Sequence, residues 1–230
     1  IQLGRGESIS DTAGVRSKYI NGIMIRTFRH SDVLDLAKYG TIPIINGLTD
    51  LMHPCQILSD LFTVYEKKGK LEGLKLAYTG DGNNVANSLL QGCAKTGMDI
   101  AVATPAGYGC DETIIEQAKQ AAKKTGSKII ITEDPEEAVK NADVVYTDTW
   151  VSMGKENEKD MRMNIFMPYQ VNSKLFSKAK EDAMFLHCLP AYRGMEVTGE
   201  IIDGPNSCVF EEAENRLHVQ KAIMVALMGG

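Results

Sequence analysis

The feature that most constrains the fold is a repeated alternation of short apolar runs with amphipathic stretches, which is regular from residue 74 onward. Strands of a parallel sheet are buried on both faces and form continuous apolar runs, and the helices between them cover those faces. The alternation therefore predicts an α/β fold with parallel sheets. The expected strands are residues 22–27, 41–46, 74–79, 100–103, 128–132, 144–147 and 184–187.

The stretches between these runs carry apolar residues at helical spacing and end at typical helix signals. Ser31 and Asp32 are expected to cap one helix, Asp111 another, and Asp134 a third that has Pro135 in its first turn. In the helix at 54–68 we expect one apolar face. That face comprises Ile57, Leu58, Leu61, Phe62 and Tyr65. The full set of expected helices is 31–39, 54–68, 84–96, 112–125, a short one from 135, one after the polar stretch 155–160, and 212–228.

The order of these elements predicts two doubly wound parallel-sheet domains, of which the first is incomplete. We assign residues 1–55 and 214–230 to the first domain and residues 56–213 to the second. The first domain has only two expected strands, which is too few for a stable sheet on its own. The chain also begins at Ile1 rather than Met, so we expect that it is part of a longer protein.

Composition excludes several classes of protein. The 25 Lys and Arg residues against 30 Asp and Glu give a net charge of −5, without the basic excess that nucleic-acid-binding surfaces usually carry. The chain has no apolar run of about 18 residues, so we expect no membrane-spanning helix. The five cysteines are scattered and form no CxxC pair, which favours reduced thiols in the cytoplasm over a metal site or a disulfide framework.

Polar side chains follow five of the expected strands, at the sheet edge where α/β proteins bind ligands. These side chains are Arg26, Asn46 with His53 and Gln56 soon after it, the turn 80–84, Asp148 and Cys188. Together they predict one binding site.

Each of these groups also has a structural interpretation that involves no ligand. Arg26 offers a planar fork for phosphate or carboxylate, and the helix that begins after His53 suits an anion, although His53 could instead be a local cap. Asp148 could hold an ammonium group or cap a helix. Cys188 could be a buried structural thiol. Arg216, which we place near the start of the last helix, could be in a surface ion pair.

The turn Gly80-Asp-Gly-Asn-Asn84 was tested as a dinucleotide-binding loop. It lacks the third small residue, and the following strand does not end in the acidic residue that an NAD site requires. We therefore interpret it as a tight glycine turn whose Asn83 or Asn84 contacts a polar ligand. An NAD-dependent oxidoreductase is the alternative from another class, together with a non-catalytic scaffold.

Five segments together resemble the ornithine carbamoyltransferases, a branch of the aspartate/ornithine carbamoyltransferase family, along the whole chain. They are His53-Pro-Cys-Gln56, Gly80-Asp-Gly-Asn-Asn84, Asp148-Thr-Trp-Val-Ser-Met-Gly154, His187-Cys-Leu-Pro190 and Glu214-Asn-Arg216. The resemblance implies transfer of a carbamoyl group from carbamoyl phosphate to the side-chain amine of L-ornithine, giving L-citrulline and phosphate. It further implies a trimer of two-domain subunits that uses no metal and no organic cofactor.

The resemblance also implies roles for individual residues. A first group would hold carbamoyl phosphate in the first domain, and a second group would hold ornithine in the second. The first group is Gln2, which would reach a neighbouring subunit's site, with Arg26, His53, Gln56, Cys188, Leu189 and Arg216. The second group is Asn84, Asp148, Ser152 and Met153. The catalytic residues would be Arg26 and His53, which stabilise charge on the carbonyl oxygen, and Asp148 and Cys188, which act on the amine.

One departure from the family pattern concerns the phosphate loop. The family has a Ser-Thr-Arg-Thr-Arg segment, and no Ser-Thr-Arg occurs in these 230 residues. We therefore expect this chain alone to bind carbamoyl phosphate poorly. Ser152-Met153-Gly154 points to ornithine rather than putrescine or acetylornithine. An acid at position 148 disfavours aspartate, an acceptor that needs cationic groups.

Overall fold

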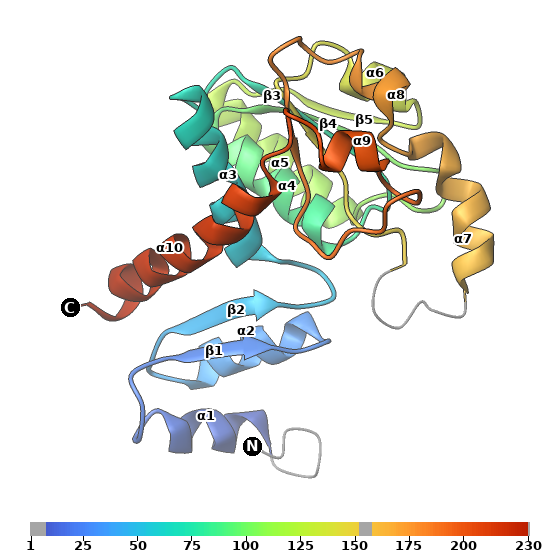
Figure 1. Ribbon diagram of the computed structural model, residues 1–230. Helices are drawn as coiled ribbons and strands as arrows, with labels where there is room; N and C mark the ends of the chain where they lie inside the picture. Colours follow the sequence, from blue (N-terminus) through green and yellow to red (C-terminus); the bar gives the residue numbers. More distant parts are fainter. Residues whose placement is uncertain (1–7, 152–157, 230) are drawn as a thin grey trace.

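In the computed structural model of the chain, residues 8–151 and 158–229 are described. The larger sheet is parallel throughout and has the strand order β5-β4-β3-β6-β7 (Figure 1). Its strands are β3 (Lys75–Thr79), β4 (Asp99–Ala103), β5 (Ile129–Thr132), β6 (Val144–Tyr146) and β7 (Met184–Leu186). The order reverses between β3 and β6. Crevices for ligands form at such a switch point.

Helices cover both faces of the larger sheet, as its apolar strands require. Alternate residues of one strand point to opposite faces, so Leu76 and Tyr78 pack in one core and Ala77 in the other. The first core lies under α3 (Pro54–Lys68), α4 (Asn84–Thr96) and α5 (Glu112–Thr125). The second core includes residues of α6 (Pro135–Val139), α8 (Ser173–Phe176) and α9 (Gly199–Ile202).

The smaller sheet consists of two parallel strands within the described ranges, β1 (Ile23–Arg26) and β2 (Ile44–Leu48). Helices α1 (Ile9–Arg16) and α2 (His30–Tyr39) pack beside it (Figure 1). A small core of Ala13, Ile25, Val33 and Leu36 joins these elements.

The last helix, α10 (Val209–Met228), packs against α3 and extends past the larger sheet (Figure 1). The remaining elements are α7 (Lys159–Phe166) and the 3₁₀ turn η2 (Met167–Tyr169). Among the residues that the structure describes, no helix combines the length and apolarity needed to cross a lipid bilayer.

The predicted α/β class and the parallel arrangement are confirmed. Helices 54–68 and 84–96 have the predicted bounds, and Asp111 and Asp134 cap α5 and α6 through their side chains. The division of the chain into domains at residues 55 and 214 stays a prediction.

Three boundary predictions were wrong. Helix α2 begins at His30, and its N-cap residue Arg29 makes no side-chain capping bond, so Ser31 and Asp32 are not its caps. Strand β2 runs to Leu48, which places Asn46 inside the strand instead of at its end. Helix α10 begins at Val209, so Arg216 lies about two turns into it.

The apolar face predicted for α3 is only half buried. Ile57 and Leu61 pack into the first core, whereas Leu58, Phe62 and Tyr65 are 47%, 38% and 53% exposed. The polar residues Gln56, Ser59, Asp60 and Thr63 take the buried positions on the other side of the helix, where α10 packs. Helical periodicity alone therefore misidentified the full inward surface of α3.

Candidate functional site

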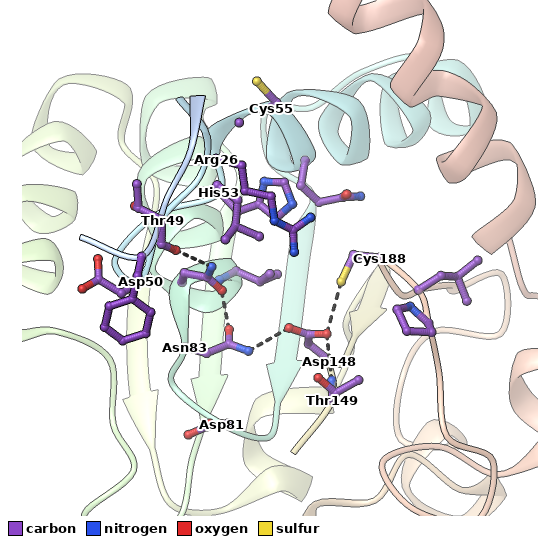
Figure 2. A pocket seen from close by; sticks show the side chains of 18 of the residues that line it. Arg26, Thr49, Asp50, His53, Cys55, Asp81, Asn83, Asp148, Thr149 and Cys188 are labelled. Carbon is purple, nitrogen blue, oxygen red and sulfur yellow. Dashed lines mark hydrogen bonds between the residues drawn. The ribbon is translucent and has the colours of Figure 1, made fainter. Parts of the chain in front are cut away.

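Eight of the predicted site residues line one cavity of about 1470 Å³, whereas Asn46 lines a separate, smaller pocket. The cavity lies between the smaller sheet and the carboxyl ends of β3, β6 and β7, and Figure 2 shows Arg26, His53, Asp148 and Cys188 around it. The predicted residues in its wall are Arg26, His53, Gln56, Asn84, Asp148, Cys188, Leu189 and Arg216. Gln2, Ser152 and Met153 lie outside the described residues.

One part of the wall is rich in cations. Arg26 ends β1, Arg216 projects from α10, and His53 stands at the N-terminus of α3 without making a side-chain capping bond. The pKa of His53 is lowered to about 4, mainly by burial and then by the charges of Arg216 and Arg26, while Asp148 opposes them. A neutral imidazole between two guanidinium groups can donate one N–H to an oxygen without adding charge.

The backbone of His53 is held by a hydrogen bond, whereas the Nδ1 atom of its ring is not. Its backbone N–H donates to Ser88 Oγ at 2.7 Å, which ties the start of α3 to α4. Its Nδ1 is buried and has no hydrogen-bond partner among the described residues. A buried polar atom without a partner is uncommon and is often explained by an unseen water or ligand.

Asp148 is the centre of the opposite wall, at the switch point of the sheet. Its Oδ1 accepts from Cys188 Sγ at 3.2 Å and from the Thr149 N–H at 2.8 Å, and its Oδ2 accepts from Asn83 Nδ2 at 2.7 Å (Figure 2). Three donors converge on this acid from β3, β6 and β7. The arrangement fixes an acceptor group that faces the cavity.

Asn83, one of the two asparagines predicted to contact a polar ligand, lies in the wall of the cavity. Its Oδ1 caps α4 by accepting from the N–H groups of Val85 and Ala86, so its amide N–H is directed at Asp148. Asn84 also lines the cavity, but its Nδ2 donates to the Thr49 carbonyl at 2.7 Å. That bond leaves the Asn84 side-chain oxygen to accept from a ligand.

Cys188 carries a neutral thiol. Burial raises its pKa well above 9, and the nearby Asp148 and Glu212 add to that effect. A thiolate would be the nucleophilic form, so this cysteine is suited to donating or exchanging a proton and not to attack. The next residue, Leu189, has a left-handed backbone with φ 53° and donates its N–H to His187 Nδ1.

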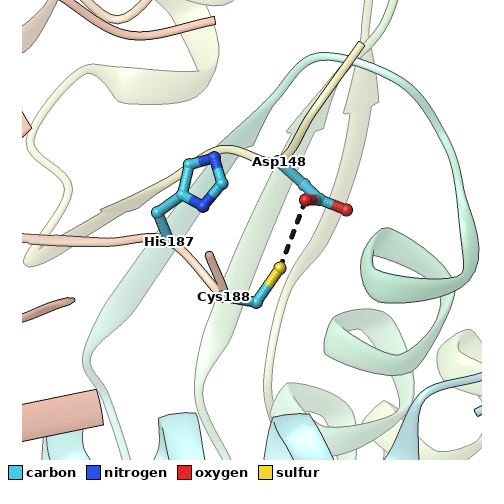
Figure 3. Close-up of side chains that lie close together, drawn as sticks. All are labelled: Asp148, His187 and Cys188. Atoms are coloured by element: carbon cyan, nitrogen blue, oxygen red, sulfur yellow. Dashed lines mark hydrogen bonds between the residues drawn. The ribbon is translucent and has the colours of Figure 1, made fainter. Parts of the chain in front are cut away.

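Asp148, His187 and Cys188 each offer a possible metal ligand atom, and these atoms lie within 4.8 Å of one another (Figure 3). Both His187 nitrogens are already used, since Nδ1 accepts from the Leu189 N–H and Nε2 pairs with Glu196 at 3.2 Å. The trio as arranged therefore lacks a free imidazole lone pair. The expectation that the site needs no metal stays a prediction.

An ion-pair network around the buried Arg162 forms another part of the wall and was missed from the sequence. Arg162 donates to Asp81 Oδ2 at 2.8 Å and to Glu158 Oε2 at 2.9 Å, and its guanidinium lies 5.0 Å from the Tyr108 ring centre. All four residues line the cavity. Arg162 stands between Met161 and Met163, and nothing in that sequence distinguishes it from an arginine whose charge is solvated.

Comparison with known proteins matches both halves of the chain to one family. Residues 1–66 match the carbamoyl-P binding domain of aspartate/ornithine carbamoyltransferase, and residues 72–227 match its Asp/Orn binding domain. The chain belongs to the aspartate/ornithine carbamoyltransferase family.

Individual relatives in this family are close. An ornithine carbamoyltransferase from Caldicellulosiruptor saccharolyticus is 61% identical, covering 98% of this chain and 73% of the relative. One from Bacillus subtilis is 59% identical over 99% of this chain and 72% of that protein. The solved ornithine carbamoyltransferase from Pyrococcus furiosus has a TM-score of 0.96 at 55% identity, covering all of this chain and 74% of that one.

Proposed function

We propose that this protein transfers the carbamoyl group of carbamoyl phosphate to the side-chain amine of L-ornithine, giving L-citrulline and phosphate. The observation that carries the proposal is the polarity of one cavity, with Arg26, His53 and Arg216 on one part of its wall and the acceptor Asp148 on another. A phosphate suits the first part and an amine suits the second. The relatives named ornithine carbamoyltransferase support the same assignment.

The chemistry joins the two substrates at the carbonyl carbon. A C–N bond forms between the neutral amine and the carbamoyl carbon, the C–O bond to phosphate breaks, and the proton that the amine loses ends on the leaving phosphate. Arg26 and His53 stabilise the charge that develops on the carbonyl oxygen, and Gln56 and Arg216 hold carbamoyl phosphate with them. Leu189 lines the junction between the substrates. Holding both substrates in one cavity removes much of the entropic cost of their encounter.

Asp148 and Cys188 act on the amine in this proposal. Asp148 accepts a hydrogen bond from the attacking nitrogen and orients it, while the neutral Cys188 thiol holds the carboxylate in place. Asn84 offers its side-chain oxygen to the amino acid part of ornithine. Gln2, Ser152 and Met153 keep the roles that the family resemblance implies, as predictions.

The first experiment is an acceptor screen with the purified protein expressed from its full reading frame. Carbamoyl phosphate is supplied with ornithine, putrescine, acetylornithine or aspartate, and each carbamoylated product is measured. We expect citrulline to form fastest. Faster carbamoylation of putrescine would show that putrescine, and not ornithine, is the acceptor. The absence of product with every amine would favour a non-catalytic role.

The 230-residue chain is assayed in parallel. Because it contains no Ser-Thr-Arg-Thr-Arg segment, we expect it to be weakly active.

A homotrimer in the cytoplasm is the setting we propose for this reaction. The five cysteines are all free thiols, as expected in a reducing compartment. The trimer rests on the family resemblance, and light scattering of the full-length protein measures it directly.

A further inference from the structure

Behind the cation-rich wall lies a buried pair of acids that the proposed chemistry does not use. Asp60 on α3 and Glu212 on α10 are each 1% exposed, and both contact the side chain of Gln56, which is also 1% exposed. Gln56 Nε2 donates to Asp60 Oδ1 at 2.8 Å and to Glu212 Oε1 at 3.2 Å. Gln56 itself lines the cavity.

This pair fixes which way the Gln56 amide points. If the amide were turned over, its oxygen would face two carboxyl oxygens in a buried position and two hydrogen bonds would be lost. The amide nitrogen is therefore held inward, and the oxygen accepts from Arg216 Nη1. Both Arg216 and Gln56 are in the cavity wall.

Glu212 also connects this amide to the rest of the site. Its Oε1 accepts from the Tyr146 hydroxyl at 3.1 Å, and its Oε2 accepts from the His187 N–H at 2.9 Å. His187 directly precedes Cys188, and Arg216 lies one helical turn after Glu212 on α10. One carboxyl group thus positions parts of α3, β6, the end of β7 and α10.

The two acids share a proton. Burial raises the pKa of Asp60 to about 7 and that of Glu212 well above its usual value, because two adjacent buried carboxylates cannot both stay charged. Glu212 accepts three donors, and its hydrogen bonds from His187 and Tyr146 lower its pKa, but burial and the neighbouring Asp60 outweigh them. Asp60 Oδ2 is buried and has no other hydrogen-bond partner among the described residues, so a proton shared with Glu212 can satisfy it.

We propose that Asp60 and Glu212 are positioning residues that hold the Gln56 oxygen as a hydrogen-bond acceptor, so that the site selects a ligand NH₂ at this point. The inference rests on the proposed function, in which the donor substrate is carbamoyl phosphate. Carbamoyl phosphate carries an NH₂ group where acetyl phosphate carries a methyl group of similar size. The Gln56 oxygen, which already accepts from Arg216, can accept a second hydrogen bond from the NH₂ group and none from the methyl group.

The experiment measures the affinities of full-length protein for carbamoyl phosphate, acetyl phosphate and inorganic phosphate by calorimetric titration in the cold. We expect the wild type to bind carbamoyl phosphate about 10-fold more tightly than acetyl phosphate, the difference expected for one hydrogen bond that only carbamoyl phosphate can make. In Glu212→Gln the new amide must face donors at one of its ends. The ratio of the affinity for carbamoyl phosphate to that for acetyl phosphate should then fall several-fold, while the affinity for inorganic phosphate should stay the same.

Asp60 supplies a matched pair of variants. Asp60→Asn removes the charge but keeps an oxygen toward Gln56 and offers a donor toward Glu212, and it should retain the wild-type ratio of affinities. Asp60→Leu has a similar shape but no acceptor, and should lower the ratio even if Glu212→Gln fails to fold. Glu211→Gln, on the same helix but paired with Lys67 at the surface, is the control and should change nothing.

Two results would overturn the proposal: wild-type discrimination in folded Asp60→Leu, or equal loss in Asp60→Asn and Asp60→Leu. A wild-type protein that binds acetyl phosphate and carbamoyl phosphate equally would also overturn it. If the wild type binds neither acyl phosphate and makes no citrulline, the proposed function fails instead. The two failures are thereby distinguished.

Discussion

Cys188 Sγ donates a hydrogen bond of 3.2 Å to Asp148 Oδ1, and this bond joins the ends of two neighbouring parallel strands (Figure 3). The contact makes the thiol a donor and places a negative charge next to the sulfur. Ionising the thiol would bring two negative charges together in a buried place. The pair is therefore one acceptor with its supporting donor, and not a thiolate nucleophile with a base.

The reactivity of Cys188 tests this relationship. Cys188 is the most accessible of the five cysteines, yet its pKa is raised well above 9 by burial and then by Asp148. We expect iodoacetamide to label it slowly in the folded protein at neutral pH, and several-fold faster in Asp148→Asn, as measured by mass spectrometry. Cys188→Ser gives the background, and unfolded protein gives full labelling. Rapid labelling of folded wild type would contradict the assignment.

Asn83 has two separable tasks, and two substitutions divide them. Asn83→Ala removes the cap of α4 and the donor to Asp148, so it should lower the free energy of unfolding by about 1–2 kcal/mol as well as activity. Asn83→Asp keeps a capping oxygen but places a second carboxylate beside Asp148. We expect it to lose activity with less loss of stability. Urea unfolding and citrulline formation measure the two effects, and parallel losses in both variants would contradict the separation.

The environment of His53 predicts a pH dependence of stability. Its pKa is lowered from 6.5 to about 4, so between these values the unfolded chain binds a proton that the folded protein does not. The contribution of His53 to stability is therefore complete above pH 6.5 and lost as the pH falls toward about 4, by at most about 3 kcal/mol.

Comparison with His53→Gln isolates this contribution. The raised pKa values of Asp60 and Glu212 act with the opposite sign, because those groups bind protons more readily when folded. Both variants contain that pair, so it cancels in the difference. We expect wild type to lose more unfolding free energy than His53→Gln as the pH falls from 6.5. Equal losses would show that His53 is not held neutral.

The ends of the strands were predictable because continuous apolar runs define them. Arg26, Asp148 and Cys188 follow such runs, and the parallel sheet then brings the carboxyl ends of neighbouring strands to one edge. Their convergence on one cavity followed from topology without knowledge of any contact.

The buried acids could not be found in the same way. Glu212 follows another glutamate near the start of a helix, which is typical of a solvated position, and Gln56 is 156 residues away in sequence. The burial of Glu212 depends on the packing of α10 against α3, a long-range contact that cannot be read from local periodicity. The same contact explains why the polar side of α3 is buried and Phe62 is exposed.

Arg162 provides a final prediction about the wall of the cavity. Its side chain is 5% exposed and pairs with Asp81 and Glu158, so Arg162→Met removes the guanidinium that binds both acids and should cost about 3 kcal/mol of unfolding free energy. Arg193 pairs with Asp203 at 2.5 Å, but both side chains are about half exposed, at 50% and 52%. Water screens that pair, so Arg193→Met should change stability far less. Urea unfolding of both variants compares the two sites. Similar losses of unfolding free energy in the two variants would show that burial does not determine how much the Arg162 network stabilises the protein. Asp81 would then be stabilised by solvent although it lies in the cavity wall.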